Sequence, residues 1–336
     1  MKKFLLGIFL AFTSAMLSAA NPESLNVPDF AKLIASDSVL LVDVRTPKEF
    51  AQGHIEGAIN VVWTSHFLDT LAKAKLPRSK RIAVYCRSGN RSKRAAEVLV
   101  NQGYRVSELA NGWLAWNNDN LFSKGLYREN QYVVLPYRDA VLGCQQTDIL
   151  IVYLHDSFAR GTDNEKQIAS SSVSSISNYL ISNGIDARLL APQCPTDRYW
   201  TERSKIHGCI MSDVLANCIS DYANQHNIKR IYLIGDAFGG AGIWRLLSKY
   251  PKLANAAMIV AAYPASDTKP ANVARTPVCV IVGNKDIYAS PDKSLPFIEN
   301  LKKKNADIRL QLLEEDHFDT CLKAYTDDNL DWLIGK

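Results

Sequence analysis

Short apolar segments rich in β-forming residues alternate with helical stretches along most of the chain, and this alternation is the strongest constraint on its fold. In the first third, residues 39–45 and 81–86 are such segments, and the helical stretch 92–104 follows the second. A longer series of strand candidates occupies residues 149–155, 186–192, 229–235, 255–262, 276–283 and 307–315, with helical stretches around 209–226, 240–250 and 291–304. Strands that alternate with helices favour parallel pairing, so we predict an α/β fold throughout.

Length and one polar segment divide the chain into two predicted domains. The chain has 336 residues, which is more than one average domain. The polar sequence NNDN at 117–120 has a turn-forming composition. We therefore predict a first α/β domain over 22–117 and a larger, doubly wound domain over 121–334.

The first twenty residues have the composition of a secretory signal peptide. Lys2 and Lys3 precede an apolar run over 4–12, and small residues fill the positions around 18–20 that a signal peptidase reads. Because the apolar run is short for a membrane span, cleavage is favoured over an uncleaved anchor. We predict that residues 1–20 are removed, that the protein is periplasmic or secreted, and that no membrane span remains.

The net charge gives little support to a nucleic-acid partner. It is +5 for the whole chain and becomes +3 once Lys2 and Lys3 leave with the signal peptide. Nucleic-acid-binding domains carry a stronger basic excess than this.

Seven cysteines in an exported protein raise the question of disulfides. Cys86 stands alone in the first third of the chain. The other six follow it: Cys144, Cys194, Cys209, Cys218, Cys279 and Cys321. We expect one reactive thiol and up to three bridges, whose pairing the sequence leaves open, while Cys279 in its apolar segment is alternatively a buried thiol. No CxxC pair occurs, so we predict neither a metal site nor a cofactor.

The sequence around Cys86 favours a reactive sulfur. A strand ends on Cys86 and a helix starts near Ser92, so the turn between them can aim backbone N–H groups at the sulfur. The positive end of the helix and the charges of nearby arginines favour the thiolate over the thiol. The same turn would bind an anionic substrate, and its candidate binding residues are Arg87, Ser88, Gly89, Asn90 and Arg91.

Two stretches of the first domain resemble single-domain rhodaneses, which are sulfurtransferases. They are LLVDVRTPKEFAQGHIEGAINV at 40–61 and VYCRSGNRSKRAAEVLVNQGYRVSELANGWLAW at 84–116. The resemblance implies that Cys86 takes a sulfane sulfur from a donor such as thiosulfate, becomes a persulfide and passes the sulfur to a thiol or cyanide. The implied partners are therefore small sulfur-containing anions and thiol acceptors.

The length of the turn argues against a cysteine phosphatase. That class places five residues between cysteine and arginine, which would require Arg at the position of Ser92, whereas this chain has Arg91. A redox or idle thiol remains an alternative. We interpret Asp43 and Arg45 as a buried pair that supports the turn, and His54 as structural. Trp113 and Trp116 are predicted to pack in the core and at the domain exit.

The second domain contains a strand, a glycine-rich turn and a helix in RIYLIGDAFGGAG at 230–242. Gly235, Gly239 and Gly240 frame a tight elbow, which in serine hydrolases presents the nucleophile. Asp286 and His317 follow strand candidates in the order of a catalytic acid and a catalytic base. The tip of the elbow, however, is Ala237.

The second domain resembles α/β-hydrolases of the predicted-esterase group, including members similar to feruloyl esterases and carboxylesterases. The matching stretches are LIVYLHDSFARGTDN at 150–164, LAPQCPTDRYW at 190–200 and RIYLIGDAFGGAGIWRLLSKYP at 230–251. Two departures argue against hydrolysis. Ala237 cannot attack a substrate, and Asp156 puts a carboxylate where the resemblance implies an oxyanion site.

These observations favour a two-domain exported sulfurtransferase with a hydrolase-like domain that binds an unknown ligand or supports the fold. Asp236 is one residue early for a nucleophile, and we interpret Ala237, Asp286 and His317 as a vestigial hydrolase site. Two alternatives remain. One is a non-catalytic binding or scaffold protein in which Cys86 is idle or in a disulfide. The other is an atypical esterase.

Overall fold

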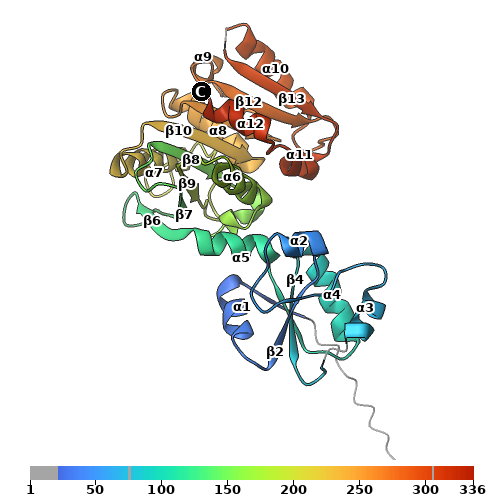
Figure 1. Cartoon of the computed structure of the whole chain (residues 1–336). Helices are drawn as coiled ribbons and strands as arrows, with labels where there is room; N and C mark the ends of the chain where they lie inside the picture. Colours follow the sequence, from blue (N-terminus) through green and yellow to red (C-terminus); the bar gives the residue numbers. More distant parts are fainter. Residues whose placement is uncertain (1–21, 75–76, 305) are drawn as a thin grey trace, which may run out of the picture. The chain divides into compact units, whose positions relative to one another are not determined.

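A computed structural model of the chain describes residues 22–74, 77–304 and 306–336 (Figure 1). The predicted signal peptide at 1–20 lies outside the described residues. The chain forms two compact units, of which the first ends at Ala110 and the second covers Asn111–Lys336. None of the helices within the described ranges is long and apolar enough to span a membrane.

The first unit is built on a five-stranded sheet in the order β1-β5-β4-β2-β3, and all its strand pairs are parallel. The strands are β1 (Glu23–Leu25), β2 (Val39–Asp43), β3 (Ile59–Asn60), β4 (Arg81–Tyr85) and β5 (Val106–Leu109), and the helices are α1 (Val27–Ile34), α2 (Pro47–Ala51), α3 (Phe67–Ala74) and α4 (Asn90–Asn101). Apolar side chains of β2, β4 and α4 form its core, including Val42, Val84 and Leu99. The sheet places the end of β4 at its centre.

The second unit contains an eight-stranded sheet in the order β13-β12-β11-β10-β8-β9-β7-β6. Its strands are β6 (Ser123–Arg128), β7 (Val134–Leu142), β8 (Ile149–Leu154), β9 (Ala187–Pro192), β10 (Arg230–Asp236), β11 (Ala256–Val260), β12 (Val278–Gly283) and β13 (Ile308–Leu313). The pairs β6–β7 and β7–β9 are antiparallel, and the remaining pairs are parallel. The predicted parallel strands are confirmed, whereas the sequence analysis missed the antiparallel β6–β7 edge.

Helices cover both faces of this second sheet (Figure 1). They are α5 (Gly112–Leu121), the 3₁₀ turns η1 (Ser157–Ala159) and η2 (Lys166–Ile168), α6 (Ser171–Ser182), α7 (Met211–Gln225), α8 (Phe238–Lys249), α9 (Pro270–Val273), α10 (Pro291–Lys302), α11 (His317–Lys323) and α12 (Asp327–Ile334). Alternate residues of β8 enter two separate cores: Leu150 and Val152 join one, and Ile151 and Tyr153 join the other. Two cores on opposite faces confirm the predicted doubly wound α/β architecture.

The predicted turn at 117–120 is wrong, because these residues lie inside α5. Asn118 is buried there, its side chain donates to the carbonyl of Ile168 at 2.5 Å, and it accepts a hydrogen bond from Ser174. The polar residues therefore satisfy partners within the second unit instead of forming a turn. Trp113 and Trp116 are half-buried on the same helix.

All seven cysteines lie in the described part of the chain, and all are free thiols in the structure. The expected bridges among the last six are therefore not formed. Burial raises the pKa of Cys218 and of Cys279 to about 12, so these two thiols are poor nucleophiles at neutral pH. Cys279 is a buried core residue, as its apolar segment indicated.

Close backbone packing at the start of α8 depends on glycine. A Cβ atom on Gly239 would lie 1.9 Å from the carbonyl oxygen of Leu154, and one on Gly235 would lie 2.6 Å from the backbone of Gly239. A contact with backbone atoms cannot be relieved by a side-chain rotation. These glycines allow α8 to cross β8 and β10 closely enough to form the elbow.

Replacing Gly239 tests this packing. We expect Gly239→Ala to lower the free energy of unfolding by about 3 kcal/mol or more, because β8 and α8 must separate. Gly184→Ala is the control: it has open space around its Cβ and a φ of +62°, so its expected cost is about 1 kcal/mol. Urea denaturation of both variants measures the difference, and equal losses would contradict the packing argument.

Candidate functional site

Cys86 directly follows β4, at the carboxyl end of the central strand of the first sheet. Its side chain is buried, with 1% of the residue exposed. Gly89 has a φ of +92° and ends the turn, and α4 begins at the next residue. The left-handed conformation, which favours glycine, turns the chain back over the sulfur.

Two hydrogen-bond donors of the described chain reach the Cys86 sulfur. The amide of Gly89 lies 3.2 Å from Sγ, and the hydroxyl of Ser92 lies 3.5 Å from it. Several turn amides were expected to converge on the sulfur, and in the described residues Gly89 supplies the amide at hydrogen-bond distance. The start of the twelve-residue helix α4 lies beside these donors, so its positive end adds to the stabilisation of a sulfur anion.

In the part of the chain that the structure describes, only Arg91 of the two turn arginines interacts with the Cys86 sulfur, and this interaction is weaker than the one with Glu49. Arg87 is exposed, as are Ser88 and Asn90. Arg91 binds the carboxylate of Glu49 through two hydrogen bonds of 2.9 and 2.6 Å, so most of its charge is matched there. The pKa of Arg91 is raised mainly by this bond to Glu49, with a smaller contribution from Cys86.

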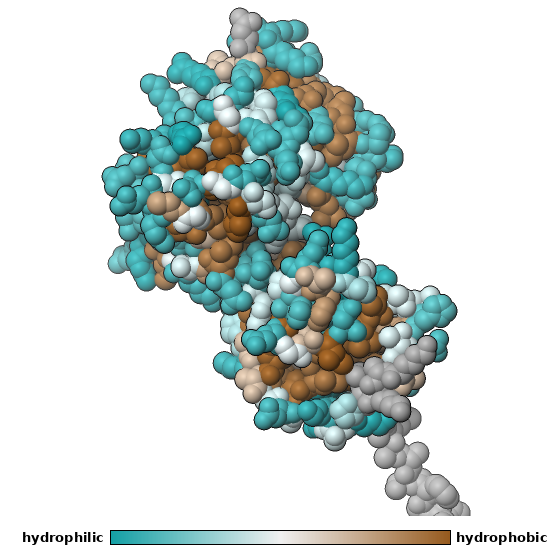
Figure 2. All heavy atoms as spheres, viewed as in Figure 1, coloured by the Kyte–Doolittle hydropathy of each residue, from teal (hydrophilic) through white to brown (hydrophobic). Residues whose placement is uncertain are grey.

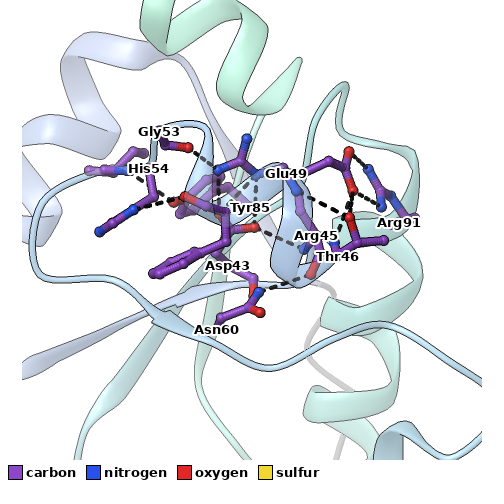
Figure 3. A network of polar contacts seen from close by, with 11 residues as sticks. Asp43, Arg45, Thr46, Glu49, Gly53, His54, Asn60, Tyr85 and Arg91 are labelled. Atoms are coloured by element: carbon purple, nitrogen blue, oxygen red, sulfur yellow. Dashed lines mark hydrogen bonds and ion pairs between the residues drawn. The ribbon is translucent and has the colours of Figure 1, made fainter.

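Glu49 is a residue that the sequence analysis missed. It belongs to a capping box at the start of α2, in which the Thr46 hydroxyl accepts from the Glu49 amide and the Glu49 carboxylate accepts from the Thr46 amide (Figure 3). The hydrogen bond from Arg91 is the main cause that holds the pKa of Glu49 at about 2. The spacing Thr-x-x-Glu at 46–49 is the signal that could have identified the cap, though not the ion pair.

Asp43 and Arg45 form the predicted buried pair, which is confirmed at 2.7 Å between Nη2 and Oδ2. Arg45 also donates to the carbonyl of Gly53, and the Asn60 side chain donates to the carbonyls of Asp43 and Arg45 (Figure 3). His54 lies at the exposed edge of this network, with its ring stacked on Phe50. The network holds the chain that follows β2 in place.

The buried carboxylate of Glu108 lies near the same Ser92 hydroxyl as the Cys86 sulfur. Glu108 of β5 is 1% exposed and accepts hydrogen bonds from Ser24 at 2.6 Å and from Ser92 at 3.3 Å. The Ser92 hydroxyl also lies 2.9 Å from the carbonyl of Gly89. The single hydroxyl proton of Ser92 can therefore be donated to one of three acceptors, which are the Cys86 sulfur, the Gly89 carbonyl and the Glu108 carboxylate. Nothing in the strand pattern around Glu108 indicated that its carboxylate would be buried beside the site.

The elbow of the second unit keeps the backbone of a nucleophile turn. Ala237 lies between β10 and α8 with φ +47° and ψ −105°, a conformation that non-glycine residues rarely adopt. Its side chain is a methyl group and offers no nucleophilic atom.

Asp286 and His317 are paired as the sequence order indicated. Nδ1 of His317 lies 2.7 Å from Oδ2 of Asp286, whose Oδ1 accepts the amides of Tyr288 and Ala289 at 2.8 Å each. His317 and Ala237 line one pocket of about 390 Å³. The structure therefore brings together the predicted remnants of a hydrolase site.

The two other acidic residues of this region have structural partners. The Asp156 carboxylate caps η1 by accepting from the amides of Phe158 and Ala159, and Asp156 does not line the pocket. The predicted opposition of its charge to an oxyanion stays a prediction.

Asp236 is fully buried and accepts hydrogen bonds from the hydroxyls of Ser172, Tyr153 and Tyr325. Burial is the main cause that raises the pKa of Asp236 to about 6. It also does not line the pocket, which agrees with excluding it as a nucleophile. Within the described ranges, no group of three or more His, Cys, Asp or Glu residues is arranged to hold a metal ion.

The first unit is similar to known sulfurtransferases. Residues 26–119 match the family described as a rhodanese-like domain. The chain is 37% identical over 107 residues to a sulfurtransferase of Allochromatium vinosum, and the match covers 32% of this chain and 94% of that protein. It is 32% identical over 120 residues to a thiosulfate:glutathione sulfurtransferase of Saccharomyces cerevisiae, covering 31% of this chain and 86% of that protein.

The second unit has the fold of α/β-hydrolases. A thermostable esterase of known structure is similar with a TM-score of 0.59 and 21% identity, over 69% of this chain and 65% of that one. At this identity the likeness concerns the fold alone.

The Arg91–Glu49 pair predicts a pH dependence of stability. Because the folded pKa of Glu49 is about 2 and its ordinary value is 4.5, the stabilisation is complete above about pH 4.5 and is lost as the pH falls towards 2. Glu49→Gln should lower the free energy of unfolding by about 1–2 kcal/mol at pH 7, a value reduced for partial exposure.

The exposed Glu56 provides the control for this measurement. Glu56→Gln should change the unfolding free energy by less than about 0.5 kcal/mol. Chemical denaturation of the three proteins between pH 2 and 7 tests the pair. A wild type and a Glu49→Gln variant with parallel pH profiles would contradict it.

Proposed function

The chain belongs to the rhodanese family through its first unit, and from this we propose that it transfers a sulfane sulfur through a persulfide on Cys86. The donor is a small sulfur-containing anion such as thiosulfate, and the acceptor is a thiol or cyanide. The observation that carries the proposal is the Cys86 sulfur at the end of β4, with the Gly89 amide at 3.2 Å and the start of α4 beside it.

The proposed reaction has two displacements at sulfur. The Cys86 thiolate attacks the outer sulfur of thiosulfate, the bond between the two donor sulfurs breaks, and sulfite leaves with the electron pair. The acceptor thiolate or cyanide then attacks the outer sulfur of the persulfide, which restores the Cys86 thiolate. The Gly89 amide and the positive end of α4 favour negative charge on sulfur in both steps.

We also propose that the protein is exported, on the basis of the composition of residues 1–20. For the second unit we propose a role in binding or support without ester hydrolysis. The methyl group of Ala237 at the tip of the elbow supports this, since the acyl-enzyme route of the fold requires a nucleophile there.

Replacing Cys86 tests the sulfur transfer. We expect Cys86→Ser to reduce thiosulfate:cyanide sulfurtransferase activity at least ~10³-fold, since a hydroxyl cannot carry a persulfide. Cys144→Ser, which changes an exposed thiol of the second unit, should retain wild-type activity. After thiosulfate treatment, mass spectrometry should find one added sulfur on the peptide that contains Cys86.

The alternatives give different results in the same experiment. A scaffold protein with an idle Cys86 would show no activity in any of the three proteins and no added sulfur. An unchanged rate in Cys86→Ser would place the chemistry at another residue.

A further inference from the structure

The pocket of the second unit has the size and lining of a small-molecule site. Its volume is about 390 Å³, and small-molecule sites commonly measure about 300–1,000 Å³. Six of its eleven lining residues are alanines: Ala237, Ala241, Ala261, Ala262, Ala265 and Ala289. Short apolar side chains leave room for a ligand and favour an apolar body.

Exposed aromatic rings lie next to this pocket. Tyr288, a lining residue that is 59% exposed, has its ring 5.3 Å from that of His317 and 6.4 Å from that of Phe318. Phe318 is 55% exposed, and its ring centroid lies 6.5 Å from that of Phe158, which is 77% exposed. Hydrophilic residues cover much of the face in Figure 2, with hydrophobic residues gathered in patches. Large apolar rings clustered in solvent commonly mark a binding site.

Two cations lie against the aromatic residues that line the pocket. Nζ of Lys293 is 4.7 Å from the ring centroid of Tyr263 and donates to the carbonyl of Tyr288 at 2.8 Å. The guanidinium of Arg160 is 5.5 Å from the ring centroid of Phe238. Tyr263, Tyr288 and Phe238 all line the pocket, so the two cations contact its lining residues, although neither cation is itself a lining residue.

Two carboxylates near the pocket, those of Asp286 and Asp156, already accept hydrogen bonds from protein donors. Asp286 is buried and accepts from His317 and from two backbone amides, and Asp156 accepts from the two amides of η1. Phe238 begins α8, and first-turn amides have no acceptor within their helix. The first turn of α8 and the two cations therefore favour an anionic group on a ligand.

We propose that this pocket binds a small organic carboxylate with an apolar, aromatic body, and holds it without cleaving it. The body lies among the alanines and aromatic rings, and the carboxylate lies near the first turn of α8, where the positive charges of the two cations attract it. The absence of cleavage rests on the proposed loss of hydrolysis at Ala237, whereas the choice of an anion rests on Lys293, Arg160 and the first turn of α8.

A matched pair of probes tests the choice of an anion. 3-Phenylpropionate and 3-phenylpropan-1-ol share a body and differ in the charge of the head group. Calorimetric titration of the full chain should show binding of the acid and at least ~5-fold weaker binding of the alcohol. Lys293→Met should weaken binding of the acid by about 2–5-fold and leave binding of the alcohol unchanged, as expected for a partly exposed charge. Lys285→Met is the control, because Nζ of Lys285 binds the carbonyl of Glu314 and does not contact the lining.

Filling the pocket tests its location. Ala241→Leu should abolish binding of both probes, and Ala265→Leu in a loop provides a second variant if the helical change disturbs folding. Equal affinity for acid and alcohol, no binding of either at millimolar concentration, or binding unaffected by both leucine variants would overturn the proposal.

Separate measurements keep the two proposals distinguishable. Turnover of 4-nitrophenyl acetate that disappears in His317→Ala would show hydrolysis at this pocket and overturn the claim that the ligand is held intact. Sulfurtransferase activity should be unchanged in Lys293→Met and Ala241→Leu, because Cys86 lies in the other unit. Loss of binding with retained sulfur transfer therefore concerns the pocket alone.

Discussion

The hydrogen bond from the Gly89 amide to the Cys86 sulfur depends on a backbone conformation that glycine adopts without strain. With φ at +92°, Gly89 turns the chain so that α4 starts next to the sulfur, and the Gly89 amide lies 3.2 Å from Sγ of Cys86. A side chain at this position would be strained in the same conformation. The buried Asp43–Arg45 pair and the Glu49–Arg91 pair hold the surrounding segments in place, and Arg91 interacts mainly with Glu49 and less with the sulfur.

Both units place a residue at a tight turn between a parallel strand and a helix, but the two turns differ in what they present. The first has a sulfur at the end of β4, with a left-handed glycine three residues later. In the second turn the residue with positive φ is at the tip itself, and this residue is Ala237. The second unit keeps the strained elbow, the His317–Asp286 pair and an apolar pocket without a nucleophile. Such a combination suits binding better than group transfer.

The sequence carried enough information for the fold and for much of both sites, since motifs fix local geometry. The strands before Cys86 and Ala237 were evident from their apolar runs, and the glycines around Ala237 indicated a tight elbow. What the sequence could not reveal were contacts between distant segments. The partner of Arg91 is Glu49, which lies 42 residues earlier in the chain and comes near it only through tertiary packing. The polar run at 117–120 similarly found buried partners and became helix.

The reactivity of Cys86 at neutral pH tests the central claim most directly. Its alkylation rate with iodoacetamide can be compared, by peptide mapping, with that of the exposed Cys144 and of free N-acetylcysteine. If the Gly89 amide and the positive end of α4 stabilise a thiolate, Cys86 reacts faster than both references although it is buried. A rate no higher than that of N-acetylcysteine would contradict an activated sulfur and, with it, the proposed sulfur transfer.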